Sequence, residues 1–191
     1  MSILPEDEGY KRPWWNRKYE FTDETIERNG HVYHRIRAKK TFTLVTGEIV
    51  KKGDLGGFIE KEINLSHDGN CWVKDNARAG GFSVDISGNA LLADQSVAGS
   101  GVVLSGNAYV HGMSSLSMAG VTDNAEVKDS ELRNVYVFGQ AKVLSSVLKH
   151  FAVENGKVIR PDKLLIKDST VFDHNIEKKD CKSEKGFLDP K

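Results

Sequence analysis

Small and apolar residues recur in pairs at positions i and i+2 through the middle of the chain, and a turn residue precedes most pairs. The clearest copies begin with Gly-Asn-Ala or Asp-Asn-Ala, and the recurring alanines are separated by 18, 17 and 16 residues. Further pairs divide each interval into steps of five or six residues. Side chains at i and i+2 lie on one face of a strand, so each pair directs two small side chains to one side. The four alanines are Ala90, Ala108, Ala125 and Ala141.

A six-residue unit repeated three times per coil predicts a three-sided parallel β-helix, an all-β fold. Each coil lies one strand spacing, ~4.8 Å, above the last, and a narrow interior accepts only small inward side chains. The repeated asparagines are then expected to form a ladder along one edge. A β-sandwich with glycine-rich turns is the alternative, but its strands would not keep a six-residue register over more than seventy residues. The ladder residues are Asn70, Asn89, Asn107 and Asn124.

The pattern divides the chain into four parts. Residues 1–17 form an N-terminal extension, and residues 18–64 form a β-hairpin and cap with a turn at Asn29-Gly30. Residues 65–172 carry the solenoid repeat, and residues 173–191 form a charged, flexible tail. The cap is expected to cover the unpaired strand edges of the first coil.

Composition and charge narrow the classes of partner. The chain has 27 Lys and Arg against 27 Asp and Glu, so its zero net charge makes a nucleic acid an unlikely partner. Two cysteines, Cys71 and Cys181, do not make a disulfide framework, and no segment reads as a signal peptide or a membrane span. These features predict a cytoplasmic protein that has no contact with a membrane.

Candidate catalytic chemistry centres on one histidine. His111 follows the inward Val110 and therefore faces outward, without an obvious carboxylate partner at a useful sequence spacing. No two histidines of the solenoid have a metal-ligand spacing, and there is no phosphate-binding loop. We predict no catalytic residue, metal or cofactor, with His111 as the alternative if the protein is an enzyme.

The stretch "YKRPWWNRKY" is the strongest candidate for a binding surface. Adjacent residues of a strand face opposite ways, so the cap cannot bury both tryptophans in one core. Tryptophan, tyrosine and arginine are also enriched at binding hot spots. The alternative is that Trp14 attaches the extension to the first coil. The predicted binding residues are Tyr10, Arg12, Trp14, Trp15 and Arg17.

Outward apolar residues of the solenoid predict a homo-oligomer, either a dimer or a trimer. The alternative is a monomer in which the leader or the tail covers them. The predicted interface residues are Val103, Tyr109, Tyr136 and Phe138.

The segments "KYEFTDET", "HRIRA" and "GDLGGFIEKEINLSHDGNCWV", with the Asn-Ala units that follow, resemble a family of small phage and prophage hexapeptide-repeat proteins. The resemblance covers about residues 18–150. It implies a left-handed β-helix in the host cytoplasm that acts by binding a host protein, for instance by inhibiting a host defence or regulatory protein. The hexapeptides are also similar to those of the trimeric hexapeptide acyltransferase superfamily, which implies an alternative enzymatic site at a subunit boundary near His111.

Overall fold

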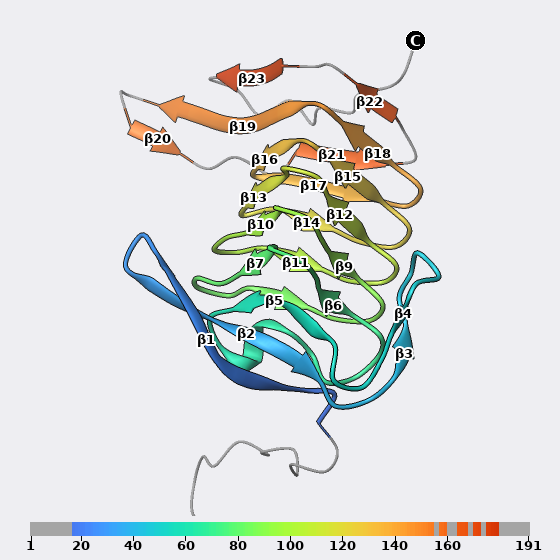
Figure 1. Ribbon diagram of the computed structural model, residues 1–191. Coiled ribbons are helices and arrows are strands. Elements are labelled where there is room, and N and C mark those ends of the chain that lie inside the picture. The colour runs from blue at the N-terminus through green and yellow to red at the C-terminus, as the bar shows by residue number, and fades with distance from the viewer. Residues whose placement is uncertain (1–16, 155–156, 160–163, 168–169, 173–174, 180–191) are drawn as a thin grey trace, which may run out of the picture.

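The computed structural model describes residues 17–154, 157–159, 164–167, 170–172 and 175–179. The chain winds into a column of stacked coils, and a twisted hairpin closes the end of the column nearest the N-terminus (Figure 1). Each coil contributes one strand to each of three sheets, and strands of successive coils pair in parallel. The predicted three-sided parallel β-helix is therefore confirmed.

The three sheets form the three faces of the column. The first sheet stacks β5 (Leu55–Ile59), β7 (Arg78–Ala79), β10 (Val97–Ala98), β13 (Ser115–Ser117), β16 (Glu131–Arg133) and β19 (Val147–Glu154). The second stacks β8 (Asp85–Ile86), β11 (Val103–Leu104), β14 (Gly120–Val121), β17 (Val135–Phe138) and β21 (Leu164–Lys167). The third stacks β6 (Trp72–Val73), β9 (Leu91–Leu92), β12 (Tyr109–His111), β15 (Glu126–Lys128), β18 (Lys142–Leu144) and β22 (Thr170–Phe172).

The parallel register keeps inward residues of successive coils above one another. Val110 lies opposite Val127, and Leu104 lies opposite Val121. The four alanines of the repeat are buried, as the pattern predicts, and they belong to one continuous apolar core. The handedness of the coil remains an implication of the family resemblance.

The asparagine ladder forms at the corner between the second and third sheets. The side-chain amide of Asn89 donates to Oδ1 of Asn107 at 3.0 Å, and the amide of Asn107 donates to Oδ1 of Asn124 at 2.9 Å. Asn70 joins through its backbone N–H, 3.4 Å from Oδ1 of Asn89. Gly106 precedes one ladder residue with a φ of +67°, and a Cβ there would lie 2.8 Å from the backbone nitrogen of Asp123. The corner therefore needs glycine both for its backbone angle and for the close approach of the next coil.

The cap is built from β1 (Tyr19–Arg28) and β2 (His31–Ala38), joined by a turn in which Asn29 and Gly30 both have positive φ. This antiparallel hairpin continues into β5, which then pairs in parallel with β7. Parallel stacking therefore begins upstream of residue 65, where the sequence pattern places the start of the solenoid. The short 3-10 helix η2 (Glu62–Asn64) and a bridge from Leu65 to Ile86 complete the first coil.

A second small hairpin, β3 (Phe42–Thr43) and β4 (Ile49–Val50), lies over the start of the third sheet. The Phe42 ring packs edge-on against Trp72, with 5.3 Å between the ring centroids. The outward side chain of Trp72, in the first coil, is buried in this way.

At the other end of the column, two strands pair with β19. The strand β20 (Lys157–Ile159) pairs with β19 in antiparallel orientation, and β23 (Asn175–Lys179) pairs with β19 in parallel. Part of the segment expected to be a flexible tail is thus a strand, whereas residues 180–191 lie outside the described residues. In the described part of the chain, no helix is long and apolar enough to cross a membrane.

Candidate functional site

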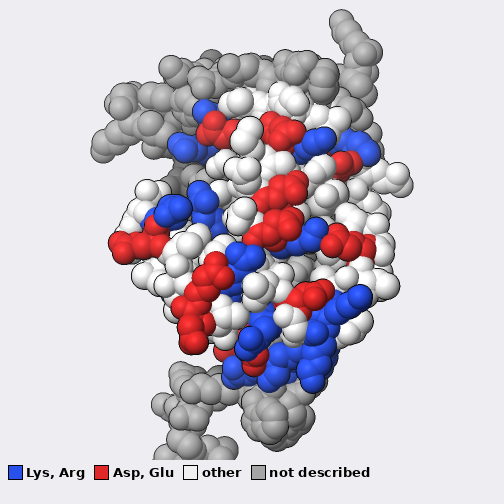
Figure 2. All heavy atoms as spheres, in the orientation of Figure 1, with Lys and Arg blue, Asp and Glu red and all other residues white. Residues whose placement is uncertain are grey.

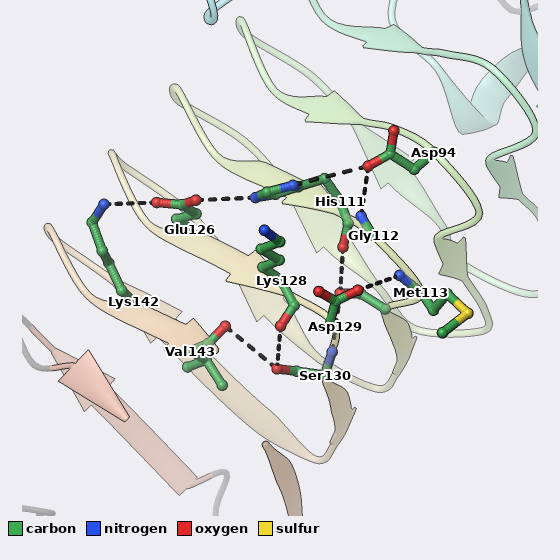
Figure 3. Close-up of polar contacts among 11 residues, drawn as sticks. Asp94, His111, Gly112, Met113, Glu126, Lys128, Asp129, Ser130, Lys142 and Val143 are labelled. Carbon is green, nitrogen blue, oxygen red and sulfur yellow. Dashed lines mark hydrogen bonds and ion pairs between the residues drawn. The ribbon is translucent and has the colours of Figure 1, made fainter. Parts of the chain in front are cut away.

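A row of polar side chains crosses four successive coils on the outer face of the third sheet (Figure 3). His111 extends from β12, Glu126 from β15 and Lys142 from β18, while Asp94 lies at the corner that follows β9. Glu126 and Lys142 occupy the same position of the parallel register as Tyr109, which precedes His111 by two residues on the same face of β12.

Carboxylates face both nitrogens of the His111 ring. Nε2 lies 3.0 Å from Oε1 of Glu126, and Nδ1 lies 3.9 Å from Oδ2 of Asp94. The second oxygen of Glu126, Oε2, accepts a hydrogen bond of 2.7 Å from the Lys142 ammonium group. The Tyr109 ring stacks on the imidazole at 4.0 Å with only 2° between the planes. The imidazole is thereby held in one orientation, and its side chain is 13% exposed.

The absence of a carboxylate partner for His111, inferred from the sequence, is wrong. Glu126 follows His111 by 15 residues and Asp94 precedes it by 17, about one coil in each direction. A search for partners at short sequence spacing misses such contacts, since neighbours in a solenoid lie one coil apart.

The electrostatics of the row favour the ionised form of the Glu126 carboxylate. The hydrogen bond from Lys142 lowers the pKa of Glu126 below its ordinary value, and the His111 ring acts in the same direction. Partial burial raises the pKa of the Tyr109 hydroxyl, which therefore stays protonated near neutral pH. A histidine oriented by a carboxylate is one half of the arrangement that activates a nucleophile. In this row, however, Nδ1 of His111, which would have to receive the proton of a nucleophile, faces Asp94.

The Asp94 carboxylate also has a structural role at its corner. Its Oδ2 accepts the backbone N–H of Gly112 in the next coil at 2.8 Å, and Oδ1 of Asp129, two coils after Asp94, accepts the N–H of Met113 in the coil between them at 3.0 Å. Both aspartates adopt positive φ, which the turn requires. The row therefore combines a hydrogen bond that closes the corner at Asp94 with a chain of polar contacts from His111 through Glu126 to Lys142.

Other candidate groups are far from this arrangement. Within the described ranges, no three or more His, Cys, Asp or Glu residues are placed to hold a metal ion. Cys71 is buried, and its Sγ lies 3.1 Å from the ammonium group of Lys18. Burial raises the pKa of the Cys71 thiol, as expected for an inert core position.

The structure locates one of the five predicted binding residues. Arg17 forms an ion pair with Glu62 at 3.4 Å, at the start of η2. Tyr10, Arg12, Trp14 and Trp15 lie outside the described residues, so a binding role for this segment remains a prediction.

The predicted oligomer residues do not share one face. Val103, Tyr136 and Phe138 lie on the outer face of the second sheet, whereas Tyr109 lies on the third sheet against His111. All four are partly buried, and the Tyr136 ring covers Gly120, where a Cβ would collide with it. Self-association through the second sheet remains a prediction.

Sequence reasoning missed three large hydrophobic residues that are the most exposed in the described part of the chain. Ile63 is 80% exposed, Phe82 is 82% exposed and Met113 is 72% exposed. All three occupy corners between strands, where no periodic pattern marks a residue as inward or outward.

The chain matches no protein-family model, and no curated protein matches it at a significant level.

Proposed function

We propose that the protein is a non-enzymatic β-helix that acts by binding another protein. The observation that carries the proposal is the exposure of Ile63 and Phe82 at one corner of consecutive coils. The resemblance to phage and prophage proteins makes a host protein the expected partner, in the host cytoplasm. Inhibition of a host defence or regulatory protein is the expected outcome of that binding.

Ile63 and Phe82 occupy the corner between the first and second sheets. Ile63 belongs to η2, and Phe82 lies between β7 and β8. The two turns are adjacent because the side chain of Asn64 donates to the carbonyl of Val84 at 3.3 Å and Leu65 bridges to Ile86. The corner thus carries two large, exposed apolar side chains on consecutive coils.

The backbone of this corner does not require an aromatic residue. The next coil makes the same corner with Ser100 and Gly101, and the N–H of Gly101 donates to the carbonyl of Phe82 at 2.7 Å. An exposed Phe or Ile side chain forgoes ~1.5–3 kcal/mol that its burial would contribute. A partner surface that covers the corner would recover that free energy, and exposed apolar patches commonly mark such contacts.

Replacing Ile63 and Phe82 with serine together is expected to reduce partner capture at least tenfold. Truncating a hot-spot residue costs ~2 kcal/mol or more, and a tenfold loss corresponds to ~1.4 kcal/mol. The measurement is quantitative affinity capture from lysate of the producing cells, with the melting temperature recorded for each variant. The melting temperature should stay unchanged, because both side chains are already in solvent.

Met113→Ser is the matched control, since Met113 is similarly exposed but lies at the corner between the third and first sheets. It should leave capture unchanged. Equal losses in the two variants, or no protein captured by the unmodified chain, would contradict the proposal.

The His111–Glu126 contact favours one alternative, an acyltransferase-like enzyme with its site near His111 at a subunit boundary. The two candidates differ in their response to acyl-CoA. A ligand at 100 times its dissociation constant stabilises a protein by ~2.7 kcal/mol, which for a chain of this size raises the melting temperature by roughly 5–11 °C.

We expect acetyl-CoA to leave the melting temperature unchanged in differential scanning fluorimetry. A clear rise that His111→Asn and Glu126→Gln both abolish would instead support the enzyme. A rise that survives both substitutions would show binding elsewhere on the protein.

A further inference from the structure

The β3–β4 hairpin and the asparagine ladder together line a groove with a volume of about 320 Å³. This volume lies at the lower end of the range for small-ligand sites. The hairpin is fixed beside the coils because Glu48, near its turn, pairs with Lys74 at 3.0 Å, and because the Phe42 ring packs on Trp72. The lining residues are Thr43, Leu44 and Val45 of the hairpin and Asn70, Asn89 and Asn107 of the ladder.

Two ladder amides that line the groove keep unused hydrogen-bonding capacity. An asparagine amide has two N–H groups and an oxygen with two lone pairs. The amide of Asn107 donates one N–H to Asn124, and its oxygen accepts one bond from Asn89. The oxygen of Asn89 accepts one bond, from the backbone N–H of Asn70. Each of these two amides therefore retains one N–H and one lone pair, and both side chains are exposed.

Asn70 and Thr43 contribute further polar groups to the groove. Asn70 joins the ladder only through its backbone N–H, and its side-chain amide forms no hydrogen bond with any described residue. The hydroxyl of Thr43, an exposed residue at the end of β3, also has no partner in the described part of the chain. The groove thus presents both donors and acceptors that the fold itself does not use.

The lining of the groove is uncharged. Charged side chains are spread over much of the height of the molecule in Figure 2, whereas none of the six lining residues carries a charge. A charged ligand would lose hydration there without gaining an ion pair. No lining residue is aromatic either, so the groove has no ring on which a base could stack. Val45, which is 37% exposed, instead provides an aliphatic contact.

An extended polypeptide segment has the matching chemistry. Asn70, Asn89 and Asn107 belong to successive coils at a spacing of ~4.8 Å, so their row extends over ~10 Å. An extended chain rises ~3.3 Å per residue, and about three residues therefore fit along the row. Each peptide unit carries one N–H and one carbonyl, which complement the unused lone pair and N–H of an asparagine amide.

We propose that the groove between the β3–β4 hairpin and the asparagine ladder binds an uncharged, extended segment of a partner protein. The asparagine amides pair with the backbone of the segment, and Val45 contacts an aliphatic side chain. The inference rests on the proposed function in that the partner is a protein, and it adds the chemistry of one contacting segment. It uses residues other than Ile63 and Phe82, so the two surfaces can be tested separately.

Nuclear magnetic resonance of the full-length, ¹⁵N-labelled protein tests the groove directly, because asparagine side-chain amides give their own signals. Three probes are titrated: a blocked pentapeptide of alternating Ala and Val, the same peptide with its backbone nitrogens methylated, and the disaccharide maltose. We expect the unmethylated peptide to shift the side-chain signals of Asn70, Asn89 and Asn107 in a saturable manner. The signal of Gln140, which lies at the same corner of a later coil, should not move.

Methylation removes the backbone donors, so the methylated peptide should bind at least tenfold more weakly than the unmethylated one. Equal binding of the two peptides would overturn the pairing of amides with backbone. Maltose should leave the three asparagine signals in place, and tighter binding of maltose than of the peptide would make the groove a saccharide site instead. The absence of any shift with all three probes would also overturn the proposal.

Asn70→Ala should weaken the peptide roughly threefold to tenfold, the effect of losing one hydrogen bond, and adding Val45→Ser should weaken it further. The melting temperature should not change, because the Asn70 side chain has no partner among the described residues and Val45 is exposed. The matched control is Gln140→Ala with Val32→Ser, a second amide and a second exposed valine outside the groove, and it should change affinity less than twofold. Equal losses in the two double variants would refute the inference. The Ile63–Phe82 capture experiment does not depend on this result, so either proposal can fail alone.

Discussion

Replacing Ala108 with phenylalanine should destabilise the protein by ~1–3 kcal/mol or more, because the solenoid interior has no room for a larger ring. Ala108 is fully buried in the middle of the column. Its carbonyl accepts the N–H of Leu91 at 2.8 Å, and the N–H of Tyr109 donates to the carbonyl of Ala125 at 3.0 Å. Coils above and below are thus fixed at strand spacing, and a ring at this position must push neighbouring coils apart or leave its preferred rotamer.

Thermal and urea unfolding measure the effect, with an expected drop in melting temperature of roughly 2–12 °C for a chain of this size. Val103→Phe is the control, since Val103 extends outward from β11 and is only partly buried. That variant should change stability by less than 1 kcal/mol. A neutral Ala108→Phe would mean that position 108 does not face the interior.

The sequence predicts the coil well because the requirement for small inward side chains applies at every turn. The alternation of positions such as Ala108 and Val110 is imposed by strand geometry, and the spacing of coils by backbone hydrogen bonding. The asparagine ladder follows from the same register. Wherever the physical constraint repeats, the pattern of residues repeats with it.

The cap and the His111 row could not be derived in the same way. The strand β5 joins the first sheet although its sequence, Leu-Gly-Gly-Phe-Ile, lacks the pattern of the later units. Partners of His111 lie 15 and 17 residues away because the corners differ in length from coil to coil. Pairing between outward side chains therefore depends on the total length of every corner between them, which residue types alone do not specify.

Exposed residues that could bind a partner are the hardest to predict. Ile63 and Phe82 lie in corners, where the chain leaves the two-residue alternation, so hydrophobicity there carries no information about burial.

Gly57→Ala is expected to loosen the cap and to cost ~1–3 kcal/mol of stability. Gly57 is buried in β5, where the cap passes over the first coil. A Cβ at this position would lie 2.5 Å from the carbonyl oxygen of Ala77, 2.7 Å from Cγ1 of Val73 and 3.2 Å from the carbonyl oxygen of Lys74. Two of these three atoms belong to the backbone, so side-chain rotation cannot relieve the collision. The small size of glycine, rather than its conformational freedom, is what this position requires.

Limited trypsin digestion distinguishes loosening of the cap from loss of the whole fold. In the Gly57→Ala protein, cleavage after the cap lysines Lys39, Lys40, Lys51 and Lys52 should accelerate, while a fragment beginning beyond the first coil survives. Gly99→Ala is the matched control, because Gly99 is also a glycine without positive φ, and the nearest atom to its added Cβ would be the carbonyl oxygen of Leu116 at 3.2 Å. It should lower the melting temperature far less and leave the cleavage rate near that of the unmodified chain. If Gly57→Ala melts like the unmodified protein and is digested at the same rate, close packing of β5 against the first coil does not hold the cap in place.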